Sequence, residues 1–383
     1  MTQDINDFVT PSCDLLALGE PTHQEPAFGW VRNELFARLV ERGFRSIALE
    51  TDRVAALAVN DYVQGGAGDL DTVMNEGFSH DVGAPAPNRR LITWMRAHNE
   101  HRPPKERLAF HGFDTPGENY STPSPRGYLE HARAYLELDV DISGLTGADE
   151  RWSRAEAVMD PAMSPGATAE AEKLRLIADD MLTSLWTRAP ELIAATSPER
   201  WLRARTHLVA GIGLLRYHHQ SATQPADPSP RVTALLAARD ALMAQNLLDI
   251  RNIEAERGAT LVFSHNLHLQ RCLSSWRLDD VVADWWGAGT IVAPLLGGRY
   301  RFVAGSLGRS AAIGLQDPDP DTYEGQLQGR IPTWGLAAAT TLSPARTRTD
   351  TTPRQGYFPL DRAMLDGADA ILHVADGSAA ACP

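Results

Sequence analysis

The chain has 383 residues, 43% of them apolar, which is enough for one large hydrophobic core or two moderate ones. Its 49 acidic residues outnumber its 36 basic residues, and the net charge of −13 argues against a broad surface for nucleic acid or for an anionic membrane. We therefore expect a small-molecule substrate as the partner, with no nucleic acid and no membrane.

The N-terminal residues and the cysteines point to an ordinary intracellular protein. The first residues, MTQDINDFVTPSCD, lack the basic and apolar stretches of a secretory signal, and no later apolar run approaches the roughly 18 residues of a membrane span. Cys13, Cys272 and Cys382 are scattered and odd in number, so they predict neither a disulfide framework nor a cysteine-rich metal site. A cytoplasmic location is expected.

Strand-like and helix-like segments alternate in the first third of the chain. Short apolar runs that end in polar or glycine residues indicate buried strands at residues 15–18, 46–49 and 108–110. Helical periodicity occupies residues 28–42, 54–64 and 88–100. This alternation predicts an α/β fold with a mainly parallel central sheet flanked by helices.

The middle of the chain has a different character. Alanine, arginine and glutamate dominate long helix-like stretches at residues 168–188 and 198–220, and no strand pattern interrupts them. The proline-rich sequence QPADPSP at residues 224–230 then breaks the helical pattern. An inserted helical subdomain is expected, which divides the chain into residues 1–118 (α/β, first part), 119–230 (insertion) and 231–383 (α/β, second part).

The last part of the chain returns to the alternating pattern. It begins with a helix at residues 231–257, and strand-like runs follow at residues 259–264, 299–304 and 370–374. These runs are expected to complete the central sheet.

Titratable residues follow four of the predicted strands. In open parallel sheets, ligands bind beyond the carboxyl ends of the strands, so side chains from separate strands can meet in one cleft. The residues concerned are Glu20 and His23, Glu50 and Asp52, His111 and Asp114, and His265 and His268.

A histidine beside a carboxylate is suited to acid-base catalysis near neutral pH. His23 could take a proton from water or a hydroxyl, and Glu20 or Glu50 could fix its tautomer and raise its basicity. An arginine would then hold a substrate oxygen or stabilise the negative charge that develops in acyl transfer. Arg32 lies nine residues after His23, and this spacing alone does not direct it into the cleft.

Each of these residues also has a structural explanation, which the sequence leaves open. His23 could cap the following helix, and Glu20 and Glu50 could pair with structural arginines. His111 could be a hydrogen-bonded core histidine, and Asp114 a turn residue.

Other chemistries find weaker support. Glu20-x-x-His23 and His265-x-x-His268 could supply zinc ligands, but such pairs are common and no HExxH helix accompanies them. The chain has no G-x-S-x-G elbow for a serine nucleophile and no phosphate-binding or dinucleotide fingerprint. We therefore expect no metal and no cofactor.

Several blocks of sequence follow one another in a characteristic order. The blocks are Leu18-Gly19-Glu20-Pro21-Thr22-His23 with Arg32, Ile47-Ala48-Leu49-Glu50, Asn60 to Gly65, Trp94 to Asn99, Phe110 to Asp114, Arg239-Asp240-x-x-Met243-Ala244-x-Asn246 and Ser264-His265-Asn266-x-His268. In their order and spacing these blocks resemble the erythromycin esterase family, and together they make a specific signal. The resemblance runs from residue 15 to about residue 305, and the helical insertion matches mainly in length and character.

The resemblance implies a fold, an activity and roles for individual residues. The cleft would lie between the sheet domain and the helical insertion, and the reaction would be hydrolysis of an ester by water. His23 would be the general base, Glu20 and Glu50 its supports and Arg32 an electrostatic stabiliser. His265 and His268 would position the substrate or protonate the leaving oxygen, and His265 stays open as an alternative base. His111, Asp114 and Trp285 are expected to contact the substrate.

The sequence also departs from the family pattern. Pro21 stands where a small residue is usual and Gln24 where glycine is usual, so the loop around His23 and its pocket are expected to differ. Residues 76–87 lack the tryptophan-containing pattern of the family.

Three hypotheses of function follow. The leading one is a metal-independent hydrolase that opens an ester or lactone of a bulky, mostly apolar natural product such as a macrolide. The second is a biosynthetic enzyme on the same scaffold that catalyses cyclisation, elimination or acyl transfer, because a base and an acid serve those reactions equally well. The third is a non-catalytic protein that sequesters such a ligand, although binding alone needs few titratable groups.

Overall fold

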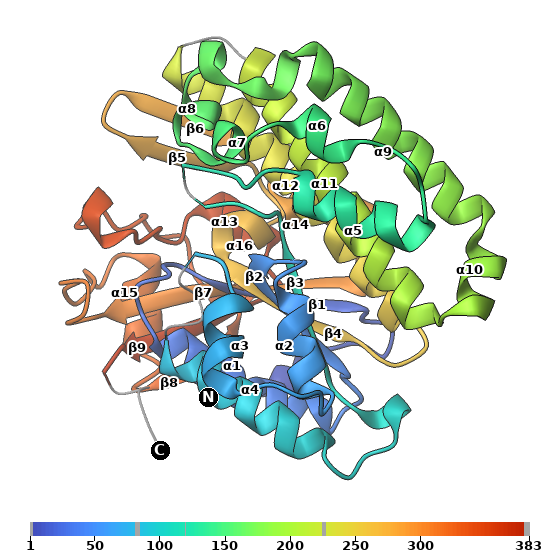
Figure 1. The fold of residues 1–383 in the computed structure, drawn as a ribbon. Coiled ribbons are helices and arrows are strands. Elements are labelled where there is room, and N and C mark those ends of the chain that lie inside the picture. Colours follow the sequence, from blue (N-terminus) through green and yellow to red (C-terminus); the bar gives the residue numbers. More distant parts are fainter. Residues whose placement is uncertain (1–2, 81–84, 119, 224–226, 379–383) are drawn as a thin grey trace.

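A mainly parallel sheet organises the molecule, as the sequence predicts. The computed structural model describes residues 3–80, 85–118, 120–223 and 227–378. Within these ranges, seven strands form one sheet in the order β3-β2-β4-β1-β7-β9-β8, and only β8 runs antiparallel to its neighbour (Figure 1). The strands are β1 (Leu15–Glu20), β2 (Ser46–Asp52), β3 (Ala109–Asp114), β4 (Thr260–His265), β7 (Tyr300–Arg309), β8 (Trp334–Ala338) and β9 (Ala370–Asp376). A separate antiparallel hairpin consists of β5 (Ser274–Leu278) and β6 (Val281–Trp285).

Both faces of the sheet are covered by helices, which explains why its central strands are buried along their whole length. Successive side chains of a strand point to opposite faces, and in β1 Leu16 and Leu18 belong to one apolar cluster while Leu15 and Ala17 belong to the other. The first cluster is closed by α1 (Ala27–Val40), α2 (Ala56–Val63), α3 (Leu70–Glu76) and α4 (Ala86–Asn99). The second is closed by α12 (Pro228–Glu254), α13 (Asn266–Leu269), α14 (Ala288–Leu296), α15 (Tyr323–Gln328) and α16 (Arg362–Gly367).

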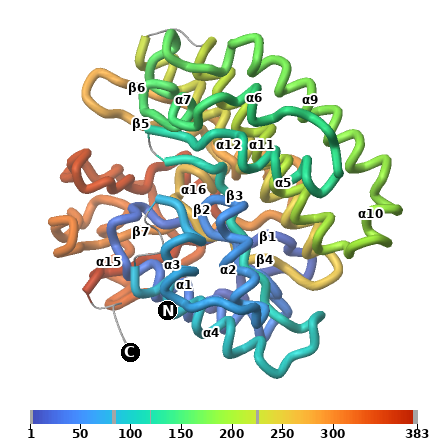
Figure 2. Tube along the Cα trace, in the orientation of Figure 1, coloured from blue at the N-terminus to red at the C-terminus, as the bar shows by residue number. Residues whose placement is uncertain are grey.

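The segment between β3 and α12 is helical and has an apolar cluster of its own. That cluster draws only on residues between Leu129 and Leu215. Figure 1 shows these helices gathered at one end of the sheet, and Figure 2 follows the chain into them and back along α12. Division of the chain at residues 118 and 230 stays a prediction, and residues 224–226 of the proline-rich break lie outside the described residues. The helices are α5 (Arg126–Leu136), α6 (Ile142–Thr146), α7 (Glu150–Ser153), α8 (Glu156–Met159), α9 (Ala169–Thr187), α10 (Ala189–Ala195) and α11 (Pro198–Thr223).

The insertion of β4 between β2 and β1 brings distant residues together. In the register of β1 and β4, Glu20 lies directly opposite His265. A hydrogen-bonded latch ties the start of α13 to β7 across β1, because the Asn266 side chain exchanges two hydrogen bonds of 2.9 Å with the backbone of Gly305. Gly19 must be glycine for this latch to fit, since a Cβ there would lie 2.0 Å from Oδ1 of Asn266.

The antiparallel edge of the sheet is covered by the N-terminal segment. The backbone N–H of Gln3 donates to the carbonyl of Leu336 in β8 at 2.9 Å, and its side-chain oxygen accepts from the N–H of Ala338 at 2.7 Å. No helix in the described ranges combines the length and the apolar character needed to cross a bilayer.

Candidate active site

The carboxylate of Glu50, in β2, is the centre of the polar cluster at the carboxyl edge of the sheet. Its Oε1 lies 3.1 Å from Nη2 of Arg239 and 3.4 Å from Nε2 of His268. Its Oε2 accepts from the Ser264 hydroxyl at 2.5 Å and lies 3.7 Å from Nε2 of His23. Burial would raise the pKa of Glu50, but the charges of His268, His23 and Arg239 outweigh it and hold that pKa well below its usual range.

His23 lies in the loop after β1, between two carboxylates. Its Nδ1 is 2.8 Å from Oε1 of Glu20, and its Nε2 faces Glu50. Desolvation lowers the pKa of His23, but the charges of Glu50 and Glu20 and the hydrogen bond to Glu20 raise it to about 9. Desolvation also raises the pKa of the Glu20 carboxyl, although His23 opposes this. The His23 side chain is 52% exposed, so water can reach the imidazole.

His268 is fixed by a buried aspartate. Its Nδ1 lies 2.9 and 3.0 Å from the two carboxylate oxygens of Asp240, a fully buried residue of α12. Asp240 also accepts from the indole N–H of Trp285 and from the backbone N–H of Ala288, both at 2.8 Å. Burial lowers the pKa of His268, but the charges of Asp240 and Glu50 outweigh it and raise it. The imidazole is therefore oriented like the histidine of an aspartate–histidine dyad, with Nε2 toward Glu50.

His265 has a different environment from the other two histidines. Its Nδ1 accepts a hydrogen bond from the backbone N–H of Leu267 at 3.2 Å, and its ring packs edge-on against Phe358 at 4.9 Å between centroids. Burial and the nearby charge of His23 lower the pKa of His265 to about 3. Its imidazole is consequently neutral, with Nδ1 engaged as an acceptor.

Arg32, on α1, faces the site, a point that its spacing from His23 left open. Its Nε and Nη2 donate to Oδ1 of Asn33 at 3.1 and 2.8 Å, and its guanidinium lies 4.8 Å from the ring centroid of Phe263. The residue is 1% exposed, and burial lowers its pKa to about 10. No carboxylate of the described residues lies within 4.0 Å of it, so its charge is available to a ligand.

Except for His265, these side chains line a cavity of about 360 Å³. Its position differs from the expected cleft between the sheet and the insertion, because none of the described residues of 119–230 lines it. Residues of α1 and α4 form part of its wall instead, on the face to which Glu20 points, since Glu20 shares the strand parity of Leu16 and Leu18. The lining residues are Glu20, His23, Glu25, Pro26, Gly29, Arg32, Leu49, Glu50, His80, Pro85, Pro87, Asn88, Arg239, Phe263, Ser264 and His268.

Three residues expected to contact the substrate do not line this cavity. His111 lies within β3 and forms a 2.8 Å contact with Glu254, and Trp285 lies behind His268, on Asp240. The Asp114 carboxylate is fully buried and binds Arg239. The His265 side chain is likewise absent from the lining.

Sequence reasoning overlooked His80, Arg239 and Asp240. His80 adopts a left-handed backbone conformation (φ 55°), and its ring nitrogens lie 3.2 Å from Asp114 and 3.1 Å from Glu118. It falls in the stretch 76–87 that departs from the family pattern. Arg239 and Asp240 carried a signal, because they are the one charged pair within the otherwise uncharged run ALLAARDALMAQNLL.

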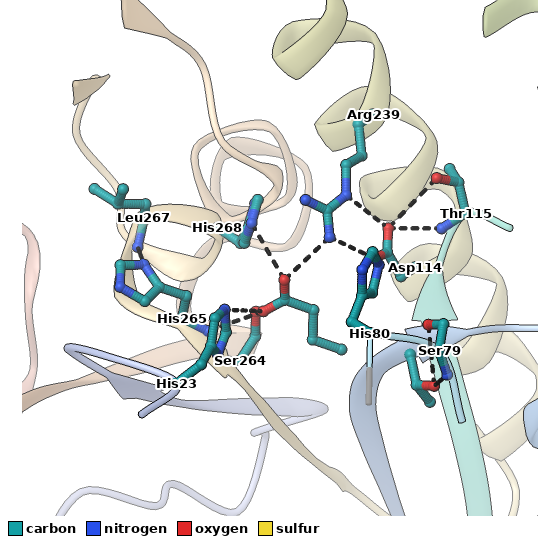
Figure 3. A network of polar contacts seen from close by, with 12 residues as sticks. His23, Ser79, His80, Asp114, Thr115, Arg239, Ser264, His265, Leu267 and His268 are labelled. Carbon is teal, nitrogen blue, oxygen red and sulfur yellow. Dashed lines mark hydrogen bonds and ion pairs between the residues drawn. The ribbon is translucent and has the colours of Figure 1, made fainter. Parts of the chain in front are cut away.

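Among the described residues, no group of three or more His, Cys, Asp or Glu side chains is arranged to hold a metal ion. The cluster instead alternates in charge, with carboxylates separated by histidines and Arg239 (Figure 3). It offers a half-exposed imidazole, a fixed second imidazole and a buried guanidinium around one cavity, which is the equipment of acid-base catalysis with charge stabilisation.

Comparison with solved structures identifies the same architecture elsewhere. A protein from Bacillus cereus superposes with a TM-score of 0.72 at 17% identity, covering 97% of this chain and 90% of that one. A mutant of the erythromycin esterase EreC in its open conformation gives 0.67 at 17% identity, with 96% and 91% covered. A succinoglycan biosynthesis protein gives 0.64 at 17% identity, with 96% and 88% covered.

Comparison of the sequence gives the family. No curated protein matches the chain. The family described as Erythromycin esterase matches residues 39–377, a span that begins after Glu20, His23 and Arg32 and includes Glu50 and His268. The chain therefore belongs to the erythromycin esterase family of esterase-type hydrolases.

Proposed function

We propose that the protein hydrolyses an ester or lactone of a natural product, with a water molecule activated by His23. The observation that carries this proposal is the position of His23, half-exposed at the cavity and held between Glu20 and Glu50. A proton taken from water would leave an imidazolium stabilised by both carboxylates.

Residues of this chain can account for each proton transfer in the hydrolysis and for the charge that develops on the carbonyl oxygen. His23 accepts a proton as the water oxygen bonds to the carbonyl carbon, and the carbonyl oxygen becomes negatively charged. Arg32 supplies a cation for that oxygen, because no carboxylate of the described part of the chain pairs with its guanidinium. When the carbon–oxygen ester bond breaks, the imidazolium of His268 or His23 donates a proton to the leaving oxygen.

His23 is a better base than His265. The Nδ1 of His265 already accepts a hydrogen bond, and burial keeps its pKa near 3, so it would bind a proton poorly at neutral pH. This difference favours His23 as the base, and we propose that His265 supports the His23 ring from outside the cavity lining, 5.2 Å away between ring centroids.

The cavity suits the reacting part of a bulky substrate. Its 360 Å³ is at the lower end of the range of about 300–1,000 Å³ for ligand pockets. Pro26, Pro85, Pro87, Leu49 and Phe263 give it apolar walls. We propose that it binds the ester and its neighbouring atoms and that the rest of a macrolide-like molecule lies outside it. Metal-independent action in the cytoplasm is part of the same proposal.

A biosynthetic reaction is the second candidate. The fixed imidazole of His268 faces the same cavity as His23, so the pair could equally move protons in a cyclisation, an elimination or an acyl transfer. One protein of similar fold carries the name of a biosynthesis protein. The mass of the product distinguishes the reactions, since hydrolysis adds one water, cyclisation conserves mass and dehydration loses water.

Mass spectrometry of a macrolide panel, with and without a chelator, tests the proposal. We expect a gain of one water that persists with chelator, is lost in His23→Ala and Glu20→Ala, and is kept in His101→Ala, an exposed histidine. Full activity of His23→Ala and Glu20→Ala would refute the mechanism. Binding without any change of mass would favour sequestration, and a product of unchanged or lower mass would favour the biosynthetic candidate.

A further inference from the structure

Arg239 bridges two carboxylates that come from different strands. From α12, its Nε and Nη2 bind the two oxygens of Asp114 in a fork, at 3.0 and 2.5 Å, and Nη2 also lies 3.1 Å from Glu50. Figure 3 shows the guanidinium between Asp114 on one side and His268 on the other.

We propose that Arg239 is a positioning residue, which holds the carboxylate of Glu50 between His23 and His268 and offsets part of its negative charge. The assignment deepens the proposed hydrolysis and rests on it for its catalytic meaning. Arg239 itself need not touch the reacting atoms.

The carboxylate of Glu50 lies between the two imidazoles. Each oxygen of Glu50 faces one imidazole, with Oε1 3.4 Å from His268 and Oε2 3.7 Å from His23. Rotation of the carboxylate would bring it closer to one imidazole at the expense of the other. Arg239 acts on Oε1 and the Ser264 hydroxyl on Oε2, so the carboxylate is held from both sides.

Arg239 is itself anchored by Asp114. Asp114 takes up its fork, and this carboxylate also accepts from the backbone N–H of Thr115 at 2.7 Å and lies 3.2 Å from Nε2 of His80. Burial would raise the pKa of Asp114, but Arg239 and His80 hold it well below its usual range. The guanidinium therefore has a permanent counter-charge and a fixed direction.

Arg239 contributes a positive charge to a cluster of titratable groups around Glu50. These groups are Glu20 at the end of β1, His23 in the loop after it, and His265 and His268 at the end of β4 and in α13. Carboxylates raise the pKa of both His23 and His268, and the charge of Arg239 acts in the opposite direction on each. Without Arg239, an even smaller fraction of His23 would be neutral and able to accept a proton at pH 7.

Titration of the histidine ring resonances by NMR tests this directly and needs no substrate. Signals of His23 and His268 are assigned by their loss in His23→Gln and His268→Gln. In Arg239→Gln we expect both midpoints to rise by about one pH unit, because a positive charge is removed. In Arg239→Lys, which keeps the charge and loses the fork, the midpoints should stay within a few tenths of a unit of wild type while kcat falls.

Asp114→Asn should shift the titration midpoint of His23 in the opposite direction. It removes the counter-charge of Arg239, so the midpoint of His23 should fall. Arg205→Gln is the matched control, since Arg205 pairs with Asp249 and its side chain is 21% exposed, like that of Arg239. It should leave both midpoints unchanged.

Each outcome decides the proposal. Unchanged midpoints in folded Arg239→Gln, as judged by circular dichroism, would overturn it. If that variant does not fold, a midpoint of His23 that fails to fall in Asp114→Asn overturns it instead. Shifts of the expected sign in a protein that hydrolyses no ester would uphold the role of Arg239 and reject the proposed function alone.

Discussion

His23 owes its acid-base behaviour to its two carboxylate neighbours. With a pKa of about 9, about 1% of the imidazole is neutral at pH 7. The surrounding charges make His23 a strong base whose active form is scarce near neutrality.

A specific pH profile follows for the wild type. Only the neutral imidazole accepts a proton from water, so kcat/KM should rise about tenfold per pH unit from pH 6 and level off near pH 9. In Glu50→Gln the loss of a negative charge should move this midpoint to lower pH. A rate that falls between pH 6 and 8 would contradict the assignment of His23 as the base.

The hydrogen bond from Trp285 to Asp240 can be tested by substitution. Trp285→Phe keeps an aromatic ring and removes the N–H that binds Asp240, so His268 loses part of its support. Because the indole lies outside the cavity, we expect kcat to fall about tenfold with KM nearly unchanged. Steady-state kinetics separate the two constants, and a large rise in KM would support the sequence-based expectation that Trp285 contacts the substrate.

Much of the candidate site could be predicted from residues that follow strands, because parallel strands deliver their carboxyl ends to one edge. Glu20, His23, Glu50 and His268 all line the cavity. Arg239 could not be assigned as the partner of Glu50, because the two lie 189 residues apart in the sequence. The hydrophobic pattern of α12 also does not fix how that helix is rotated about its axis over the sheet.

The apolar runs in the sequence located six strands of the sheet but not the residues at which they end. The run 15–18 became β1, which continues to Glu20, and 46–49 became β2, which continues to Asp52. The polar residues at these strand ends have low strand propensity. Pairing with the neighbouring strands and contacts within the site nevertheless hold them in extended conformation. The hairpin of β5 and β6 and the edge strand β8 were missed because they are short and partly exposed.

The latch between α13 and β7, which passes over Gly19 of β1, carries a prediction of its own. In Gly19→Ala the new Cβ would displace the Asn266 side chain and so disturb the start of α13, which bears His268. We expect a loss of about 1–3 kcal/mol in the free energy of unfolding and a lower kcat. Denaturant unfolding measures the first effect and steady-state kinetics the second.

Gly127→Ala is the control, because a Cβ there meets no atom within 4 Å and α5 should gain about 0.5–1 kcal/mol. Adding Asn266→Ala to Gly19→Ala relieves the clash, so the double variant should be less destabilised than the sum of the two single changes. Simple additivity would argue against the latch.

The helical insertion and the candidate site are built from separate sets of residues. The insertion has its own apolar cluster, and the cavity is lined from the sheet, α1, α4, α12, α13 and the loops that carry His23, His80 and Pro85. The insertion should therefore affect stability more than chemistry.

Leu208→Ala tests that separation. Leu208 is fully buried in the insertion cluster, so its truncation should cost about 2–5 kcal/mol of unfolding free energy and leave kcat/KM within about twofold. Leu247→Ala, in α12 against the sheet, should lower both quantities, because α12 carries Arg239 and Asp240. A folded Leu208→Ala with much reduced kcat/KM would mean that the insertion contributes to the site.

The pairing of Gln3 with β8 also affects how readily the protein can aggregate through the edge of its sheet. An edge strand with free N–H and C=O groups is a template for another chain, and growth from such an edge leads to fibrils. By occupying the carbonyl of Leu336 and the N–H of Ala338, Gln3 blocks part of that template. Shortening the chain beyond this residue would remove the block and leave the edge open to intermolecular strand addition during storage at high concentration.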